Sequence, residues 1–328
     1  MNLDTRIYSF QDRLSERFPS QVMVDITEVC NLGCIHCPHP AFKLSSHYHK
    51  KMINPELNKK MVDEVREFGR GITKYLRYTS NGEPLVHPKS YEMIQYAVEK
   101  SNTKVTLTTN GTLLNEKKMK KLLDTGLHMI DISVDAFSNE TYAKVRVGGN
   151  LDITKKNILK LLDLRNQTEK KTKIIVSFVE QKENSAEINK FKEFWTKAGA
   201  DEVLIRKLHS NSGTTLKDDE VYRNELNKID VNQNRKPCLY PWERIILNAR
   251  GMLAFCPTDW YGESEIIDYS ETTIKEVWQN KFYKSLRDQH LKLEFKCEFC
   301  KKCPDWKNTS WPGEKDKSYA DLVEKILY

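Results

Sequence analysis

Cysteines are the residues of this 328-residue chain whose spacing points most directly to chemistry. The N-terminus lacks the apolar centre of a secretion signal, so we expect a cytoplasmic protein. Disulfides are rare in that compartment, and metal or redox chemistry explains the eight cysteines better. They fall into two groups, which predicts two separate sites: Cys30, Cys34 and Cys37 near the start, and Cys238, Cys256, Cys297, Cys300 and Cys303 in the last third.

The first group has the spacing CxxxCxxC and directly follows a strand expected at 22–26, so it should form a loop at the end of that strand. A short loop with Gly33 can wrap three thiolates round one iron–sulfur cube, for which cysteine is the usual ligand. Three ligands leave one iron open, as chemistry at a metal requires. A structural zinc loop is the alternative, with a fourth ligand drawn from His36, His39, His47 and His49.

The second group combines two cysteines around a hairpin with a CxxCxxC run farther along the chain. The hairpin is expected from 244–247 and 252–255, and Cys256 follows it directly. A hairpin with a distal CxxC pair makes a good four-thiolate cage. A zinc ribbon with four cysteines is the alternative.

Short β-rich runs alternate with helix-period segments from about residue 20 onward. Alternation with short connections predicts right-handed βαβ units and a parallel sheet. We therefore predict an α/β fold, a partial (β/α)6 TIM-type barrel with functional residues at the C-terminal strand ends. A flavodoxin-like open sheet is the alternative from periodicity alone. The six expected strands are 22–26, 75–78, 105–108, 129–134, 174–179 and 202–205.

The alternation stops near residue 210, which predicts a second, smaller domain after a polar connector. We expect a helix from about Ile274 to His290 and an amphipathic C-terminal helix that docks on the rest of the protein. The predicted organisation is an N-terminal extension, a barrel, a linker and a small hairpin-plus-helix domain for the second cysteine site, at 1–20, 21–210, 211–236 and 237–328.

The first loop resembles the signature of the radical S-adenosylmethionine (radical SAM) enzymes, which follows the first strand of a partial barrel. The run Asn81-Gly82-Glu83-Pro84 after the second strand resembles the family's GGEP motif, with Asn in place of its first Gly. This resemblance covers about residues 20–205. It implies a [4Fe–4S] cluster on the three thiols, whose open iron chelates the methionyl part of S-adenosylmethionine (AdoMet). Reductive cleavage then gives a 5′-deoxyadenosyl radical, which takes a hydrogen atom from the substrate.

The resemblance also implies ligands for the methionyl group. Glu83 or the adjacent backbone at Asn81 and Gly82 would hold the ammonium, although an ordinary Asn-Gly turn is an acceptable alternative. Ser133 and Arg146 would grip the carboxylate. A structural Asp135–Arg146 pair is an equally simple interpretation of that arginine.

Two further positions carry expectations at the strand ends. Asn110 belongs to a Thr-Asn-Gly run that ends the third strand, and we count it with the cofactor site. His36 stands where the family usually has an aromatic residue near the adenine.

The second group resembles the auxiliary-cluster domains called SPASM, or their shortened "twitch" form. The full form needs about seven cysteines, so five imply one auxiliary [4Fe–4S] cluster. In similar chains the CxxC pair lies between an Arg-x-x-His segment and an aromatic residue, as Arg287, His290 and Trp306 lie here. That frame favours Cys238, Cys256, Cys300 and Cys303 as ligands, with Cys297 spare. The pair Cys297 and Cys300 is the alternative.

A single auxiliary cluster resembles the aminocyclitol dehydrogenases, which oxidise an alcohol to a ketone and pass an electron to that cluster. We therefore expect a small polyol, sugar or aminocyclitol substrate, with Arg146, Glu180 and His209 as candidate proton acceptors. One alternative is a radical epimerase that uses Cys297 as hydrogen donor. Another is a ribosomal-peptide-modifying enzyme, for which the roughly 20 residues before the first strand leave little room for a leader-binding domain. A zinc-stabilised binding protein is the non-enzyme alternative.

Charge and hydropathy limit the kinds of binding partner that we expect. Lys and Arg number 53 against 46 Asp and Glu, and a net charge of +7 would suit a phosphorylated or nucleotide-linked sugar. The chain has no dense basic stripe and no apolar run near the roughly 18–20 residues of a membrane span, so we expect neither nucleic acid nor membrane. The family resemblance implies a flavodoxin- or ferredoxin-type electron donor.

Overall fold

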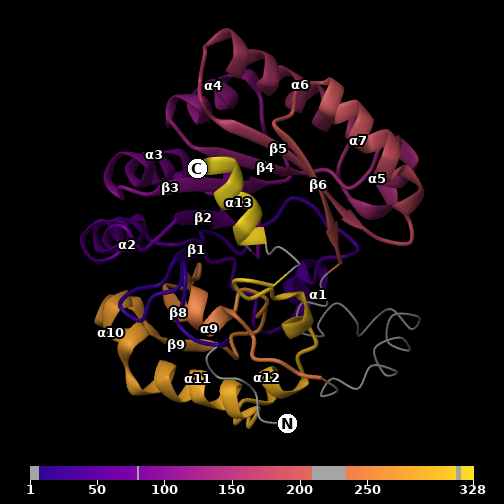
Figure 1. The fold of residues 1–328 in the computed structure, drawn as a ribbon. Coiled ribbons are helices and arrows are strands. Elements are labelled where there is room, and N and C mark those ends of the chain that lie inside the picture. Colours follow the sequence, from indigo (N-terminus) through magenta and orange to yellow (C-terminus); the bar gives the residue numbers. More distant parts are fainter. Residues whose placement is uncertain (1–6, 80, 209–233, 315–318) are drawn as a thin grey trace.

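The chain folds around one sheet with the strand order β6-β5-β4-β3-β2-β1-β7-β8-β9 (Figure 1). The computed structural model describes residues 7–79, 81–208, 234–314 and 319–328. The first six strands pair in parallel, each with the next along the chain, which confirms the predicted partial barrel. A flavodoxin-like sheet would reverse its order at a switch point. These strands are β1 (Gln21–Asp25), β2 (Tyr75–Thr79), β3 (Lys104–Thr109), β4 (Met129–Ser133), β5 (Lys173–Glu180) and β6 (Glu202–Lys207).

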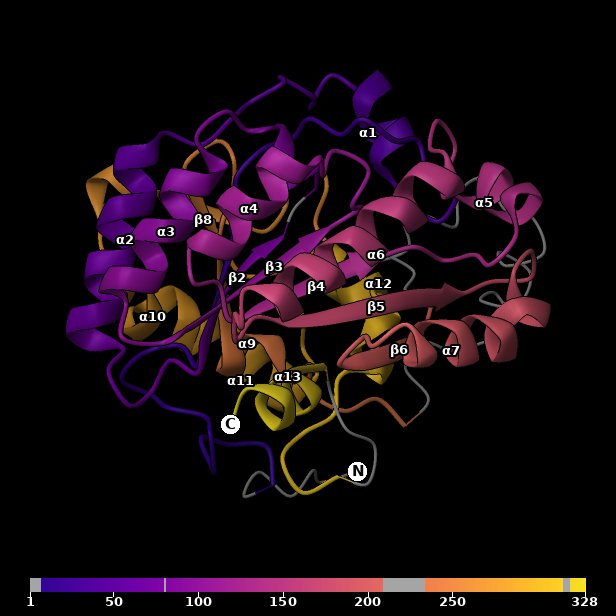
Figure 2. The ribbon, with the colours of Figure 1, turned by 90° about the horizontal axis from the view of Figure 1, so that it is seen from above.

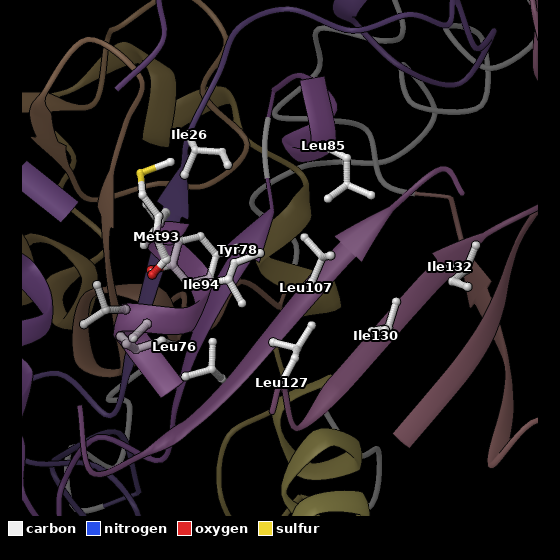
Figure 3. Packing of buried hydrophobic residues seen from close by; sticks show 14 of the residues in the cluster. Ile26, Leu76, Tyr78, Leu85, Met93, Ile94, Leu107, Leu127, Ile130 and Ile132 are labelled. Atoms are coloured by element: carbon white, nitrogen blue, oxygen red, sulfur yellow. The ribbon is translucent and has the colours of Figure 1, made fainter. Parts of the chain in front are cut away.

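Helices cover the outer face of these six strands, as the view from above shows (Figure 2). Alternate strand residues such as Leu76, Leu107 and Ile130 are fully buried against them (Figure 3). The residues between them face inward, and many of those are polar. The helices between these strands along the chain are α1 (His39–Leu44), α2 (Pro55–Phe68), α3 (Ser90–Lys100), α4 (Glu116–Asp124), α5 (Asn139–Val145), α6 (Leu151–Gln167) and α7 (Ile188–Lys197).

The predicted hairpin is present, but it continues the barrel sheet. Strands β7 (Arg244–Leu247) and β8 (Met252–Ala254) pair antiparallel, while β7 also pairs in parallel with β1. A third strand, β9 (Glu265–Asp268), was not predicted, because its two isoleucines stand between acidic residues and give a weak strand pattern.

The helix expected from Ile274 to His290 is two helices, α10 (Ile274–Gln279) and α11 (Lys281–Lys292). Asn280 separates them: its backbone is extended and its side chain accepts a hydrogen bond from the Tyr283 backbone N–H. Asparagine is among the best residues for starting a helix in this way. The prediction of one helix was therefore wrong. The remaining elements are α9 (Tyr240–Glu243), α12 (Glu298–Lys302), and the 3-10 turns η1 (Pro84–Val86), η2 (Ser185–Glu187), η4 (Tyr269–Glu271) and η5 (Asp305–Asn308).

The C-terminal helix α13 (Tyr319–Leu327) docks as predicted, and it does so on the inner face of the sheet (Figure 1). Ala320 and Val323 are buried in one cluster with inward-facing residues of four strands: Tyr75, Met129, Ile175 and Leu204. Since Tyr75 and Met129 begin their strands, α13 covers the N-terminal end of the inner face and leaves the C-terminal end for a site. Among the described residues, no helix combines the length and the apolar character needed to cross a bilayer.

His128 makes the stability of the sheet depend on pH. Its Nδ1 accepts a hydrogen bond from the Val105 backbone N–H at 3.1 Å, and burial lowers the His128 pKa to about 4. The unfolded chain takes up this proton near pH 6.5. The stabilisation is therefore complete above about pH 6.5 and is lost as the pH falls towards 4.

We expect the His128→Asn variant to show a smaller loss of stability than the wild type between pH 7 and pH 5. Urea unfolding at the two pH values measures this difference. The exposed His47 provides the control, since His47→Asn should keep the wild-type pH dependence. Equal pH dependence in the wild type and His128→Asn would contradict the prediction.

Candidate functional site

A cavity of about 200 Å³ opens at the C-terminal ends of the first four strands. The structure brings every residue predicted for the cluster and for AdoMet to the wall of this cavity. They are Cys30, Cys34, Cys37, His36, Asn81, Gly82, Glu83, Asn110, Ser133 and Arg146.

The cysteine loop between β1 and α1 is held by backbone contacts with the last residue of α5 and the segment that follows it. Gly33 N donates to Val147 O at 2.8 Å and Ile35 N donates to Val145 O at 3.2 Å. Burial raises the pKa of Cys30 to about 11 and that of Cys37 to about 12, because water no longer solvates the thiolates. A bound metal would supply the missing positive charge, so these thiols fit a metal cluster better than they fit free ionised groups.

The Gly-Glu-Pro turn packs directly on the chain that leads into the cysteine loop. Glu83 N donates to Val29 O at 2.9 Å. The buried Glu83 carboxylate also accepts from Leu85 N at 3.1 Å, Thr109 Oγ1 at 2.6 Å and Asn110 N at 2.7 Å. Both carboxylate oxygens are thus engaged within the chain. This favours the other predicted option, the backbone of the turn, as the acceptor for an ammonium group.

Gly82 is the position where this turn tolerates no side chain. A Cβ there would stand 2.4 Å from Val29 O and 2.6 Å from Thr27 O, and both contacts are with backbone. At Gly33 the nearest atoms to a Cβ are 3.9 Å away, an ordinary contact. The cysteine loop can therefore adopt this conformation without a glycine at position 33, although the sequence suggested a role for Gly33 in it.

We expect Gly82→Ala to weaken AdoMet binding by about ten-fold or more. The added methyl group must displace the backbone of the turn, and each 1.4 kcal/mol lost from the binding free energy is a factor of ten in affinity. Gly33→Ala is the matched control and should bind AdoMet like the wild type. Equilibrium dialysis with labelled AdoMet measures both variants. Equal affinities for the two variants would show that the turn yields without affecting the cavity.

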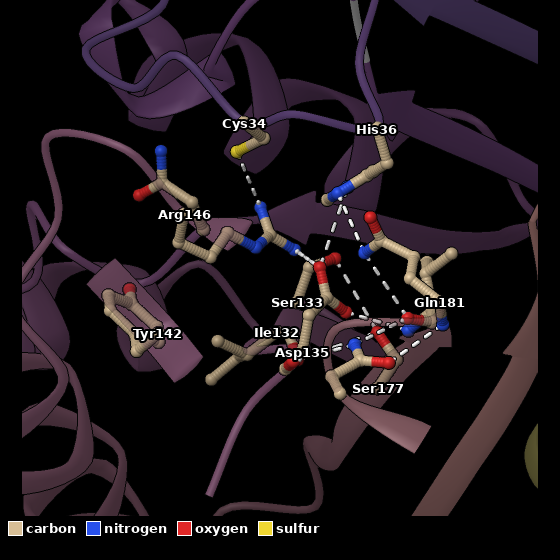
Figure 4. Close-up of polar contacts among 12 residues, drawn as sticks. Cys34, His36, Ile132, Ser133, Asp135, Tyr142, Arg146, Ser177 and Gln181 are labelled. Carbon is tan, nitrogen blue, oxygen red and sulfur yellow. Dashed lines mark hydrogen bonds and ion pairs between the residues drawn. The ribbon is translucent and has the colours of Figure 1, made fainter. Parts of the chain in front are cut away.

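The buried residues Arg146 and Asp135 form one polar network with the partly buried His36 beside the cysteines (Figure 4). Arg146 Nη2 lies 2.5 Å from Asp135 Oδ2, and Arg146 Nη1 donates to Cys34 Sγ at 3.4 Å. His36 Nε2 lies 3.5 Å from the same Asp135 oxygen, and Gln181 Nε2 lies 3.1 Å from His36 Nδ1. The Asp135–Arg146 ion pair that the sequence offered as an alternative is therefore present.

The charges of this network decide which members can take up a proton. Burial lowers the pKa of Arg146, but Asp135 and then Cys34 raise it further, so the net shift is upward and the guanidinium stays charged. A guanidinium that stays charged does not suit the predicted role of proton acceptor. Burial lowers the His36 pKa to about 4, so the ring is neutral at pH 7.

Asp135 adopts a left-handed backbone conformation, with φ of 63°, which is strained for a residue other than glycine. Its Oδ1 accepts from Val179 N at 2.7 Å, and its carbonyl accepts from Asn184 Nδ2 at 2.9 Å. These contacts hold the strained residue so that its other carboxylate oxygen faces Arg146 and His36. Ser133 lies nearby on β4, with its hydroxyl 3.4 Å from that of Ser177.

Four cysteines of the second group line another cavity, and they are the four predicted ligands: Cys238, Cys256, Cys300 and Cys303. Cys297 does not line it. His290 Nδ1 accepts from Cys238 N at 3.3 Å, so the predicted Arg-x-x-His frame does contact this site. The thiols surround a space rather than one point: in the described part of the chain, no three Cys, His, Asp or Glu side chains are close enough to share a single metal ion.

Cys297 directly precedes α12 as its N-cap residue and is half-buried. A hydrogen bond with Cys300 lowers the Cys297 pKa to about 6, with help from nearby backbone N–H groups and against its burial. It lines neither of these two cavities, nor a third one on the inner face of the sheet. Its predicted role as a hydrogen donor therefore receives no support from its position.

A third cavity, of about 320 Å³, lies on the inner face of the sheet between the other two. It shares His36 with the first cavity, and Tyr240 and Thr258 with the second. Glu180, a predicted proton acceptor, is exposed and lines none of the three, so its position gives that prediction no support. His209, the remaining one, lies outside the described residues.

Sequence reasoning missed Trp260, which comes from the loop after Cys256 and lines the first cavity. Its ring meets those of Phe42 and His39 edge-on, with centroids 5.5 and 6.2 Å apart. Asn81 Nδ2 donates to Asp259 O at 3.2 Å, which ties the same loop to the AdoMet-side turn. An isolated tryptophan just after a ligand cysteine was the available signal.

Comparison with protein families gives two matches. The model of the radical SAM superfamily matches residues 24–191, and that of the SPASM iron–sulfur cluster-binding domain matches residues 238–304. These matches overturn the zinc-stabilised binding protein alternative. The cofactors that accompany the two domains are AdoMet, a [4Fe–4S] cluster and an auxiliary iron–sulfur cluster.

Curated relatives match over part of their length. A probable GTP 3′,8-cyclase from Methanococcus maripaludis (strain C5) is 35% identical over 141 residues, 43% of this chain and 45% of the relative. The AdoMet-dependent heme synthase of Methanosarcina barkeri (strain Fusaro) is 30% identical over 128 residues, 39% of this chain and 34% of the relative. The chain thus spans less than half the length of either protein.

Solved structures with the same fold cover most of the chain. BtrN in complex with AdoMet and 2-DOIA gives a TM-score of 0.56 at 16% identity, over 84% of this chain and 88% of BtrN. Streptococcus suis SuiB bound to the precursor peptide SuiA gives 0.64 at 16% identity, over 95% of this chain and 75% of SuiB. With the family matches and the convergence of the predicted residues on one cavity, the conclusion is that this chain is an enzyme of the radical SAM superfamily with a C-terminal SPASM domain.

Proposed function

We propose that the enzyme oxidises an alcohol group of a small substrate to a ketone. The observation that carries this proposal is the arrangement of the three cavities. The inner cavity shares His36 with the AdoMet-side cavity and Tyr240 with the cavity of the auxiliary thiols. A substrate bound there would have hydrogen-atom abstraction on one side and an electron acceptor on the other.

In this proposal Cys30, Cys34 and Cys37 hold the first cluster, and the auxiliary cluster is held by Cys238, Cys256, Cys300 and Cys303. When bound, the first cluster and AdoMet supply the 5′-deoxyadenosyl radical. The backbone at Asn81 and Gly82 receives the methionyl ammonium.

Arg146 and Ser133 receive the methionyl carboxylate. The Nε of Arg146 is buried and has no hydrogen-bond partner among the described residues, which leaves a donor for that group. Asn110 supports this end of the cavity: its amide donates to Asn31 Oδ1 at 3.0 Å, and its carbonyl oxygen accepts from Thr112 N, also at 3.0 Å. Trp260 and His36 remain as the rings available to pack on the adenine.

The oxidation balances as the loss of two hydrogens. The substrate carbon gives one hydrogen atom, which forms 5′-deoxyadenosine. The hydroxyl then gives a proton to a base as the carbon–oxygen double bond forms, and a cluster held by the auxiliary thiols would supply the acceptor for the one electron that leaves. We assign the base to His36, because its ring lines both the AdoMet-side cavity and the inner cavity and lies 3.5 Å from the Asp135 carboxylate.

Size and fold support a small substrate. The inner cavity of about 320 Å³ is at the lower end of the range for ligand pockets. BtrN, whose structure contains AdoMet and 2-DOIA, is matched over 88% of its length. A flavodoxin- or ferredoxin-type protein would deliver the starting electron, and the cytoplasm is the expected compartment.

The test is anaerobic reconstitution followed by product analysis in deuterated water. We expect about eight irons and eight sulfides per chain, as two cubes require, and 5′-deoxyadenosine on reduction. Incubation with small polyols and their phosphates should give a product that has lost two hydrogens and carries no solvent deuterium on carbon. Deuterium on carbon without loss of mass would identify an epimerase and would refute the proposal.

A further inference from the structure

The inner cavity has a strongly positive wall. Among the described residues that line it, none is acidic and four are basic: Arg77, Arg206, Lys207 and Arg244. They come from β2, from the end of β6 and from the start of β7. Strands far apart in the sequence therefore place their cations at one space.

Two of these four charges are matched by carboxylates behind the wall. Arg206 pairs with the fully buried Asp131, and Arg244 pairs with the buried Glu243. The other two lack such a match: Arg77 donates to Thr108 Oγ1 at 3.2 Å, and Lys207 is exposed. Neither forms an ion pair with a described residue. About two positive charges are thus left for a ligand.

The arginines are also held in place. The Tyr319 ring of α13 lies 4.2 Å from the Arg77 guanidinium and 4.4 Å from that of Arg206, and Tyr319 Oη donates to Asp131 at 2.8 Å. The Nε of Arg206 is buried and has no hydrogen-bond partner within the described part of the chain. This N–H is therefore a donor that a bound group can satisfy.

We propose that the substrate of this enzyme carries a phosphoryl group, which binds at Arg77, Arg206 and Lys207. The inference rests on the proposed function for the location of the substrate in the inner cavity. A phosphate monoester carries about −1.5 to −2 charges at pH 7, which matches the unpaired excess, whereas one carboxylate would leave a cation unmatched. The planar guanidinium fork suits phosphate oxygens. A cavity of about 320 Å³ favours a small phosphomonoester over a nucleotide-linked sugar.

Calorimetric titration of the cluster-loaded, AdoMet-bound enzyme tests this with glycerol 3-phosphate and inorganic phosphate as probes, beside acetate and glycerol. We expect both phosphates to bind, and glycerol not to bind. Lys207→Gln and Arg77→Gln should each weaken phosphate binding by about ten-fold, the equivalent of 1.4 kcal/mol. Lys207 is exposed, so its variant keeps the fold even if the Arg77 variant does not. Lys144→Gln, an exposed position on α5 outside the cavity, should bind like the wild type.

Two results would overturn the inference. Acetate binding as tightly as phosphate would mean a site for single carboxylates, and the absence of phosphate binding while AdoMet binds would mean no anion site. Ketone formation from a neutral polyol alone, with no phosphate binding, would refute the phosphoryl group and leave the dehydrogenase intact. Phosphate binding by an enzyme that makes an epimer would refute the dehydrogenase and leave the anion site standing.

Discussion

His36→Phe should bind AdoMet within about two-fold of the wild type and lose ketone formation by at least about a hundred-fold, the typical contribution of a positioned base. Phenylalanine keeps a ring of similar shape and removes both nitrogens. Among the described residues, His36 alone lines both the AdoMet-side cavity and the inner cavity. Burial lowers its pKa to about 4, so the ring is neutral at pH 7.

The informative measurement is the ratio of ketone to 5′-deoxyadenosine. In His36→Phe we expect 5′-deoxyadenosine to form without the matching ketone, because hydrogen-atom abstraction does not need the base. The exposed His47 gives the control variant His47→Phe, which should keep the wild-type ratio. Full ketone formation by His36→Phe would remove His36 as the proton acceptor, and loss of AdoMet binding would assign it to the cofactor alone.

The second prediction with a large effect distinguishes the roles of Cys297 and Cys300. Cys300→Ala should lower the iron content from about eight to about four per chain, the content of one cube, and stop ketone formation. Cys297→Ala should keep both clusters and the activity. The reason is geometric: Cys300 lines the cavity of the auxiliary thiols together with Cys238, Cys256 and Cys303, and Cys297 does not.

Iron and sulfide analysis of the two purified variants measures this, with 5′-deoxyadenosine as the check on the first cluster. Cys300→Ala should still cleave AdoMet, since the N-terminal thiols are unchanged. Loss of iron in Cys297→Ala would instead support the pair Cys297 and Cys300 as ligands. A Cys297→Ala variant that keeps both clusters and 5′-deoxyadenosine formation, yet makes no product, would support the epimerase.

The sequence predicted the barrel well because its signals are local. Runs such as 105–108 and 174–179 are short, β-branched and bounded by helix-period segments. The site followed from the fold, since parallel strands bring their C-terminal ends to one edge. This is why Cys34, Glu83 and Ser133, from three different strand ends, meet at one cavity.

What the sequence could not predict depends on partners far along the chain. The motif identifies Glu83, but only the folded chain brings Thr109 and Asn110 to its carboxylate. The pairing of β7 with β1 joins residues more than two hundred positions apart. The same holds for Arg77 and Arg206, each unremarkable in its own strand, which contact one tyrosine of α13.

The pairing of β7 with β1 protects an edge of the barrel sheet that would otherwise be bare. β1 is an interior strand only because β7 covers the side that β2 does not. A truncated chain that ended at Leu208 would expose the N–H and C=O groups along Gln21–Asp25, next to the apolar side chain of Met23. Bare edges of this kind recruit a strand from another molecule. Whatever metal it binds, the C-terminal segment therefore also protects the barrel from self-association.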